Sequence, residues 1–351
     1  MAFTERYGSS PSRVIDLLSA WDIPFGALQP GDKVCVMTDS AMDPLVWQSA
    51  MAVIKMRGAE GLLCLFPRLA YHNADPPQMA IEAARVSNVV VALTTTALNS
   101  GTPGLRSIRS EGGGIGKTPI WLMEELTVEI MTAGGGSMTR HELQEIADLQ
   151  RRVGSVYDRG KVIRVLSKGG SDLVAQIDGY PANAQADRWG EVPFLRRPDG
   201  RLGDGTWPFG EVHVEPVPGT ANGTVVWDVT AHHPPGVWRE PVALTIQDGR
   251  VVSIDGGIEA AEVRKYLEAY GDENSYLLGG EISLGTNPKC PPYTGQMRSE
   301  KKRYGSMHFG MGHGADRGIV KSKLRLEGII GQVTIVVDDE TAVCEDGVIK
   351  V

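Results

Sequence analysis

Acidic, imidazole and guanidinium side chains recur in four glycine-containing segments of the second half of the chain. These segments are W-P-F-G-E-V-H-V-E-P around Glu211, G-G-E-I-S-L-G-T-N-P around Glu281, Y-G-S-M-H-F-G-M-G-H-G around His308, and K-L-R-L-E-G around Arg325 and Glu327. Glycine beside a strand lets the backbone turn and present such groups to a cavity. Two carboxylates and one imidazole suit Zn²⁺, Mn²⁺ or Fe²⁺, and three protein ligands leave the open position that a catalytic metal needs. Each segment alone is a weak signal, and together they make Glu211, Glu281 and His308 candidate metal ligands.

Arg325 cannot be a ligand, because a guanidinium stays protonated and has no lone pair to donate. We expect it to place a fixed positive charge beside the metal, with Glu327 as a fourth ligand or as the partner of Arg325. The alternative is purely structural, since structural ion pairs also occur. In that interpretation Glu211 and Glu281 are half-exposed strand carboxylates, His308 is a hydrogen-bonded core histidine, and Arg325 pairs with Glu327 across a solvent-facing strand.

The first half of the chain alternates short apolar runs with helical periodicity, which is typical of strands joined through helices into a parallel sheet. Expected strands are 34–37, 61–66, 88–93 and 119–123, and expected helices are 44–56, 78–85 and 140–157. A chain of 351 residues exceeds the size at which single cores stop growing, roughly 250 to 300 residues. We predict two domains, with residues 1–160 as a doubly wound α/β domain.

After residue 161 the chain has frequent β-runs broken by Gly, Pro and Asp, with few helices. Expected strands are 162–166, 173–177, 211–215, 224–229, 242–246, 251–254, 332–337 and 348–351, with one helix at 258–270. Such a pattern predicts an α+β domain with a mostly antiparallel sheet, residues 161–351, which carries the metal site. The polar segment 178–210 is long for a loop, so we expect it to border or cover a site.

Composition excludes several classes of function. The net charge is −8 and the basic residues are scattered, apart from Lys301, Lys302 and Arg303, which we expect on a solvated face. No apolar segment is long enough for a membrane helix, and the first residues do not resemble a secretion signal. The four cysteines form no C-x-x-C pair, so reduced thiols are expected. These features predict a cytoplasmic protein with a small-molecule substrate and no nucleic-acid or membrane partner.

Three further signals are weaker. The run Glu111 to Thr118 resembles a phosphate-binding loop, but it has Glu at the first glycine position and precedes Pro119 and an expected strand. His72 and His141 are isolated and are predicted to be surface or capping residues. The adjacent pair His232 and His233 rarely converges on one metal, so we rank it as a substrate-loop candidate.

At the four segments the sequence resembles the thermophilic metallo-aminopeptidases of the aminopeptidase T type. The phrases S-K-G-G-S-D-L, A-N-G-T-V-V-W-D, D-G-R-V-V-S-I-D-G-G and E-K-K-R-Y-G-S-M-H-F-G support the resemblance. The resemblance implies a homodimer and two metal ions, with Glu211, Glu281 and His308 at ligand positions. The last ligand motif of the family, H-x-D, reads Arg325-Leu326-Glu327 here. The resemblance and this departure together imply one divalent metal ion, held by Glu211, Glu281 and His308.

These observations favour metal-assisted hydrolysis of an amide or related C–N bond in a small anionic or heterocyclic substrate. Arg325 and Glu327 are the candidate catalytic residues, and Arg325, His313 and Tyr304 the candidate substrate contacts. The chain also resembles the ferrous ring-opening 2,5-dihydroxypyridine 5,6-dioxygenases, so oxygenation of a hydroxylated N-heterocycle is the second hypothesis. A non-catalytic small-molecule-binding protein is the third.

Overall fold

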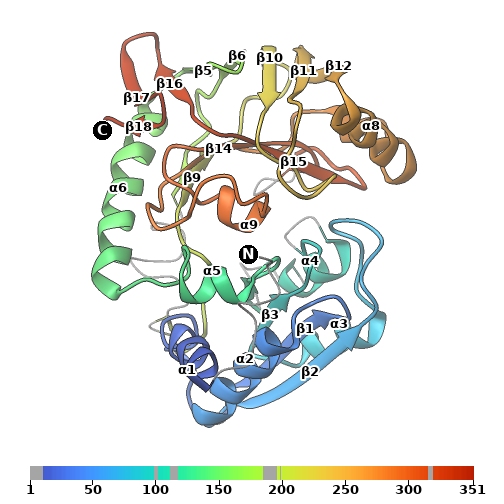
Figure 1. The fold of residues 1–351 in the computed structure, drawn as a ribbon, viewed down its shortest axis with the longest axis vertical. Helices are drawn as coiled ribbons and strands as arrows, with labels where there is room; N and C mark the ends of the chain where they lie inside the picture. The colour runs from blue at the N-terminus through green and yellow to red at the C-terminus, as the bar shows by residue number, and fades with distance from the viewer. Residues whose placement is uncertain (1–10, 99–101, 111–117, 185–195, 198, 315–318) are drawn as a thin grey trace.

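A computed structural model describes residues 11–98, 102–110, 118–184, 196–197, 199–314 and 319–351. The chain forms two β-sheet assemblies, one above the other, joined at one side by the long helix α6 (Figure 1). The N-terminal assembly has a parallel sheet, and the C-terminal assembly has two antiparallel sheets. The predicted fold class, a doubly wound α/β half followed by a mostly antiparallel half, is confirmed. Among the described residues no helix is long and apolar enough to cross a membrane.

The N-terminal sheet has the strand order β2-β1-β3-β4-β8, with parallel pairing throughout. Its strands are β1 (Lys33–Asp39), β2 (Glu60–Phe66), β3 (Val89–Leu93), β4 (Ile120–Leu122) and β8 (Gly205–Thr206). The order reverses between β1 and β3, and ligands of doubly wound sheets bind beyond the carboxyl ends of the strands at such a point. Strand β8 comes from the segment 178–210, so this part of the second half returns to the first sheet.

Helices cover both faces of the parallel sheet because its strands are apolar on both sides. Val34 and Val36 of β1 belong to one buried cluster, while Cys35 and Met37 belong to another on the opposite face. The helices are α1 (Pro11–Ala20), α2 (Pro44–Met56), α3 (Gln78–Arg85), α4 (Pro103–Ser110), α5 (Val128–Thr132) and α6 (Arg140–Arg159). Helix α6 begins at a capping box formed by Thr139 and Glu142.

The larger C-terminal sheet has eight strands in the order β12-β11-β10-β6-β5-β16-β17-β18. They are β5 (Val162–Leu166), β6 (Asp172–Gln176), β10 (Asn222–Trp227), β11 (Val242–Gln247), β12 (Arg250–Gly256), β16 (Thr334–Val337), β17 (Thr341–Glu345) and β18 (Val348–Ile349). Helix α8 (Ile258–Tyr270) and the 3₁₀ helix η2 (Glu273–Tyr276) follow β12. Helix α8 packs on the edge of this sheet (Figure 1).

The smaller C-terminal sheet has five antiparallel strands in the order β15-β14-β13-β9-β7. They are β7 (Asn183–Ala184), β9 (Glu211–Val214), β13 (Ile282–Gly285), β14 (Met307–Gly312) and β15 (Arg325–Ile330), and the short helix α9 (Met297–Glu300) precedes β14. One face of this sheet packs on the larger sheet in a shared hydrophobic core. The other face looks toward the N-terminal assembly (Figure 1), so polar groups on it lie between the two halves of the chain.

Most expected elements are confirmed, with α2, α3, α8 and β5 at the predicted bounds. Helices α1, α4 and α5 and strands β13, β14, β15 and β17 were not predicted as elements. The phosphate-loop-like run falls almost wholly outside the described residues, as does the middle of the segment 178–210.

Candidate functional site between the two halves of the chain

The polar face of the smaller C-terminal sheet carries most of the chemistry-bearing residues predicted from the sequence. Side chains alternate between the two faces of a strand. In β14, Met307, Phe309 and Met311 enter the hydrophobic core, so His308 points to the opposite face. The same alternation in the neighbouring strands places further polar residues on that face, namely Glu211, Glu281, Arg325 and Glu327.

Strand register brings Glu281, His308 and Glu327 together. Glu327 is paired with Gly310 in the ladder between β14 and β15, and the Gly310 N–H donates to the Glu281 carbonyl at 3.2 Å. Gly310 therefore separates the two carboxylates and has no side chain to fill the gap. A Cβ at Gly310 would lie 3.3 Å from both Glu327 Cγ and Gly280 Cα. The Glu281 Oε1 to His308 Nε2 distance is 3.1 Å.

The N-terminal half contributes groups from loops that follow its parallel strands. His72 follows β2, and Glu124 and Glu125 follow β4. The His72 ring is fixed by the Ala97 N–H, which donates to Nδ1 at 3.0 Å, and by the His232 carbonyl, which lies 3.2 Å from Nε2. Glu125 has a positive φ of 60°, an uncommon conformation for a residue other than glycine.

His232 belongs to the loop after β10, which runs beside β15. Its N–H donates to the Glu327 carbonyl at 3.0 Å, and its ring stacks on His72 with 4.3 Å between centroids. The side chain is fully buried, and within the described residues neither ring nitrogen has a hydrogen-bond partner. Its Nε2 is 3.6 Å from Glu327 Oε2. The two ring nitrogens of His232 are therefore buried polar atoms that remain available to hydrogen-bond a ligand.

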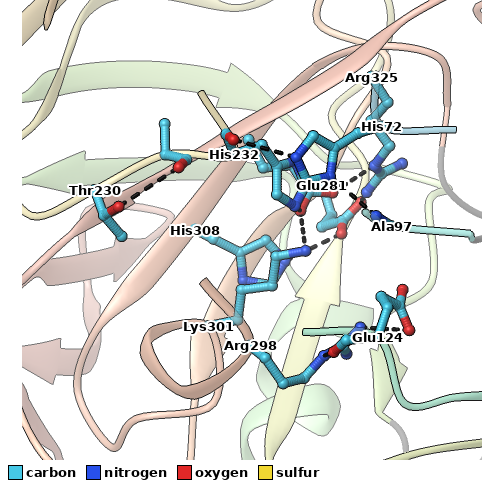
Figure 2. A network of polar contacts seen from close by, with 12 residues as sticks. His72, Ala97, Glu124, Thr230, His232, Glu281, Arg298, Lys301, His308 and Arg325 are labelled. Carbon is cyan, nitrogen blue, oxygen red and sulfur yellow. Dashed lines mark hydrogen bonds and ion pairs between the residues drawn. The ribbon is translucent and has the colours of Figure 1, made fainter. Parts of the chain in front are cut away.

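Basic side chains around helix α9 complete the site. Arg298 pairs with Glu124 at 2.6 Å, Lys301 pairs with Glu327, and Lys302 pairs with Glu211. In the view of Figure 2, Lys301 and His308 appear below His232 and Glu281, with the Arg298–Glu124 pair further down. The prediction that residues 301–303 form a solvated face is wrong for Lys301 and Lys302, which are buried.

Arg325 lies between two carboxylates. Its Nε donates to Glu327, its Nη2 donates to Glu281, and its Nη1 donates to the His313 carbonyl at 3.1 Å. Burial alone would raise the pKa of Glu281, but the Arg325 charge outweighs it and holds that pKa well below its ordinary value. The pKa of Glu327 is likewise low, because Lys301 and Arg325 outweigh the effect of burial. Both carboxyls are therefore ionised at neutral pH.

Glu125 and His232 have shifted pKa values of a different kind. Burial raises the pKa of Glu125 to about 7, against the opposing charges of Lys301 and Arg298. Burial and the Lys301 charge lower the pKa of His232 well below its ordinary value, so the imidazole is neutral. A carboxyl that titrates near neutrality can accept or donate a proton under physiological conditions.

The first group of ligand-type residues is Glu281, His308 and Glu327, with donor atoms that lie within 4.8 Å of one another. These residue types could hold a metal ion, but cations already contact both oxygens of Glu327 and one oxygen of Glu281. Only Glu281 Oε1 and His308 Nε2 have no cation in contact, and the fixed charges of Arg325 and Lys301 would repel an ion held among the three side chains. The donors as arranged do not fit a three-ligand centre.

The second group is His72, Glu125 and His232, also within 4.8 Å. Two histidines and a carboxylate are the ligands of many non-heme iron oxygenases. However, the His72 Nδ1 accepts the Ala97 N–H, so in the neutral ring Nε2 carries the proton and has no lone pair for a metal. Metal-bound histidines instead donate their second N–H to an acceptor. His72 therefore does not fit as a ligand.

The other predicted residues lie around this site in different ways. Glu211 pairs with Lys302, and its carboxylate is 3.8 Å from His308 Nε2. The group whose donor atoms all lie within 4.8 Å of one another contains Glu327 in its place. His313 is buried, with its Nε2 3.1 Å from Arg106 of α4. The Tyr304 hydroxyl accepts the Ile349 N–H at 3.1 Å, on the far sheet, and the structure does not bring it to Glu281 and His308.

Four groups in the site were not recognised from the sequence. His72 was expected at the surface or at a helix end but is buried, and His232 was ranked only as a substrate-loop candidate. Glu125 follows the apolar run of β4 at the carboxyl edge of a parallel sheet, a position that is a signal for binding sites. Lys301 lies within the E-K-K-R-Y-G-S-M-H-F-G phrase and was expected on a solvated face rather than in the site. By contrast, His141 is exposed, as predicted.

Comparisons with known proteins agree with the resemblance seen in the motifs. A curated relative, the 2,5-dihydroxypyridine 5,6-dioxygenase of Pseudomonas putida, is 31% identical over 134 residues, which is 38% of this chain and 35% of that protein. The match thus spans about a third of the relative's length.

Two solved structures share the fold over nearly their whole length. The 2,5-dihydroxypyridine dioxygenase from Pseudomonas putida superposes with a TM-score of 0.70 at 21% identity, over 96% of this chain and 97% of the other. Wild-type AmpT from Thermus thermophilus superposes with a TM-score of 0.66 at 16% identity, over 97% and 100% of the two chains. A model of the NicX family, 2,5-dihydroxypyridine 5,6-dioxygenase, matches residues 131–349, well over half of the sequence. The chain therefore belongs to the 2,5-dihydroxypyridine 5,6-dioxygenase (NicX) family.

Proposed function

We propose that this chain is an enzyme that acts on a small hydroxylated N-heterocycle between its two halves, and that ring opening by dioxygen is its leading reaction. The observation that carries the proposal is the NicX family match over residues 131–349, a range that contains His232, Glu281, Lys301, His308 and Arg325. This ranking places oxygenation above the hydrolysis favoured by the motifs alone.

Proton transfer is the part of the reaction that the side chains support best. Glu125 has a pKa of about 7, and its Oε2 has no hydrogen-bond partner among the described residues. A ring nitrogen of His232 lies within 4.8 Å of a Glu125 carboxylate oxygen, so one small molecule could contact both. We propose that Glu125 removes the proton of a ring hydroxyl and that His232 orients the ring.

The buried cations would hold the anion that this step produces. Lys301 is close enough to lower the pKa of His72 and His232 electrostatically. An ammonium in a buried site stabilises a nearby ring oxyanion more strongly than it would in water. A deprotonated dihydroxylated ring is rich in electrons, and in ring opening it transfers electrons to dioxygen while both oxygen atoms enter the product.

Oxygen uptake with 2,5-dihydroxypyridine tests the proposal directly. We expect one dioxygen to be consumed for each ring opened, measured with an oxygen electrode and by loss of the ring absorbance. Glu125→Gln should lower the rate by about 10²- to 10⁴-fold, the usual contribution of a general base. His141→Gln, at an exposed position on α6, is the matched control and should leave the rate unchanged. No uptake by the purified protein, with or without added Fe²⁺, would contradict the assignment.

Hydrolysis of an amide in a small anionic or heterocyclic compound is the second candidate. The observation in its favour is that the candidate base Glu125 and the buried cation Arg325 belong to the same site. Glu125 could deprotonate water, and Arg325 could stabilise the oxyanion that forms. Ammonia released from a pyridine carboxamide under nitrogen would select this reaction over oxygenation. If the protein binds such compounds and converts none of them, the third hypothesis, a binding protein, takes their place.

A further inference from the structure

We infer that Arg325 and Lys301 are fixed cations of the two groups of ligand-type side chains, with Arg325 between the carboxylates of the first and Lys301 beside the second, and that the residues present do not fit a bound transition-metal ion. The inference goes beyond the proposed function, because it concerns what supplies positive charge in the site and holds for oxygenation and hydrolysis alike. It also departs from the metal dependence that the resemblance implies.

Arg325 is the cation of the first group. Its two donor edges contact Glu281 and Glu327, and its third donor contacts the His313 carbonyl. The side chain is 4% exposed, so bulk water does not compete for these contacts. A planar guanidinium bridges two carboxylates with fixed geometry. The Arg325 guanidinium therefore bridges Glu281 and Glu327, as a divalent ion bound between two carboxylates would.

Lys301 is the cation of the second group. Its ammonium pairs with Glu327, and its charge acts on His72, Glu125 and His232. The same Glu327 oxygen lies 3.6 Å from His232 Nε2, so the Lys301 charge stands beside the second group and links it to the first. The His72 ring is fixed as the tautomer that cannot ligate a metal through Nε2.

Charge balance supports the same conclusion. Arg298, Lys301, Lys302 and Arg325 are paired with Glu124, Glu211, Glu281 and Glu327, so four cations oppose four carboxylates. A divalent ion added to these four pairs would bring two positive charges into a buried site, of which an ionised Glu125 could compensate one. Full charge compensation would therefore require a lysine to lose its proton or a cation to leave.

Metal content of the wild-type protein is the primary test. The protein is produced with added Fe²⁺, Zn²⁺ or Mn²⁺, desalted, and analysed by inductively coupled plasma mass spectrometry. We expect less than about a tenth of an equivalent of any of them, because a formed three-ligand site retains its ion strongly. About one equivalent that is lost in Glu281→Gln or in His232→Ala would overturn the inference.

A variant that creates a donor provides the complementary test. Arg325→His removes the guanidinium and offers an imidazole beside Glu281, His308 and Glu327, so it should retain close to one equivalent of Zn²⁺ or Mn²⁺. Arg164→His, at an exposed pair on the larger sheet, is the matched control and should retain none. Failure of a folded Arg325→His protein to bind metal would contradict the central position of Arg325.

Thermal melting of the wild type covers the case in which Arg325→His does not fold. A ligand that binds only the folded state raises the melting temperature. We expect no shift with added Mn²⁺ or Zn²⁺ and none after EDTA dialysis. A rise with metal or a fall with EDTA, abolished in Glu281→Gln, would refute the inference. Since neither measurement uses a substrate, failure of the proposed reaction leaves the result interpretable.

Discussion

Arg325→Met is the substitution that tests the charge network most directly. Arg325, Glu281 and Glu327 are 4%, 8% and 1% exposed, and Arg325 is one of two cations that neutralise the two carboxylates. Its loss leaves one buried carboxylate without a partner, and breaking such a pair from one side costs about 3–5 kcal/mol. We therefore expect a fall of that size in the free energy of unfolding.

The double variant Arg325→Met/Glu281→Gln restores neutrality and distinguishes charge from packing. Replacing both members of a buried ion pair is often nearly neutral, so it should recover about 1–3 kcal/mol relative to Arg325→Met. Urea unfolding followed by far-UV circular dichroism and tryptophan fluorescence gives the midpoints. Arg164→Met is the control, because its pair with Asp172 is 43% and 53% exposed and should change stability by less than about 1 kcal/mol.

The pH dependence of this difference follows from the lowered pKa of Glu281. A carboxyl whose pKa is lower in the folded state stabilises the protein above its ordinary pKa of 4.5 and loses that contribution as the pH falls toward the folded value. The gap between wild type and Arg325→Met should therefore narrow below about pH 4.5. If Arg325→Met costs no more than Arg164→Met, or if the double variant loses the sum of the single effects, the network does not hold as described.

Three other predictions use different parts of the structure. Catalytic efficiency should rise with pH through about 7, because Glu125 loses its proton there. Glu125→Gln should remove this pH dependence. If the pH–rate profile of that variant matched the wild type, Glu125 would be excluded as the base. Gly310→Ala should lower the free energy of unfolding by about 1–3 kcal/mol in urea, because the added Cβ lies 3.3 Å from Glu327 Cγ. Gly179→Ala is the control: a Cβ there has open space, so this variant should show only the cost of its positive φ. We also expect a homodimer, which light scattering coupled to size exclusion would contradict by giving a mass near 37.8 kDa.

Much of the fold could be predicted because local pattern and tertiary structure agree in many of its elements. The helix 44–56 begins after Asp43, whose side chain accepts the Leu45 N–H, with Pro44 at its first position. The strands of the polar sheet were recognised only as motifs, because their glycines and charged residues interrupt the apolar alternation that marks a strand. The short strand β8 could not be predicted, since its pairing with β4 depends on a partner more than eighty residues away.

Part of the site could also be predicted from the sequence. Glu281, His308, Arg325 and Glu327 do lie together, because each is in a strand, or in the case of Glu281 directly before one, on the side opposite its apolar inward residues. The possibility that Glu327 is the partner of Arg325 agrees with the ion pair in the structure. The solvent-facing position expected for that pair does not, because both side chains are buried.

The fixed charge of Arg325 was predicted, but the roles of Lys301 and Lys302 could not be, because nothing in the ligand motifs indicates that these two side chains are buried. Lys301 and Lys302 stand in a run that is charged and hydrophilic, and such runs are usually solvated. Their burial follows only from the way helix α9 packs against the polar sheet, which brings each ammonium to a carboxylate. A carboxylate–histidine motif therefore indicates that positive charge is required at a site, but not whether a metal ion or a basic side chain supplies it. The difference lies in the charge balance of the site, and in this chain four basic side chains already pair with Glu124, Glu211, Glu281 and Glu327 before any metal binds.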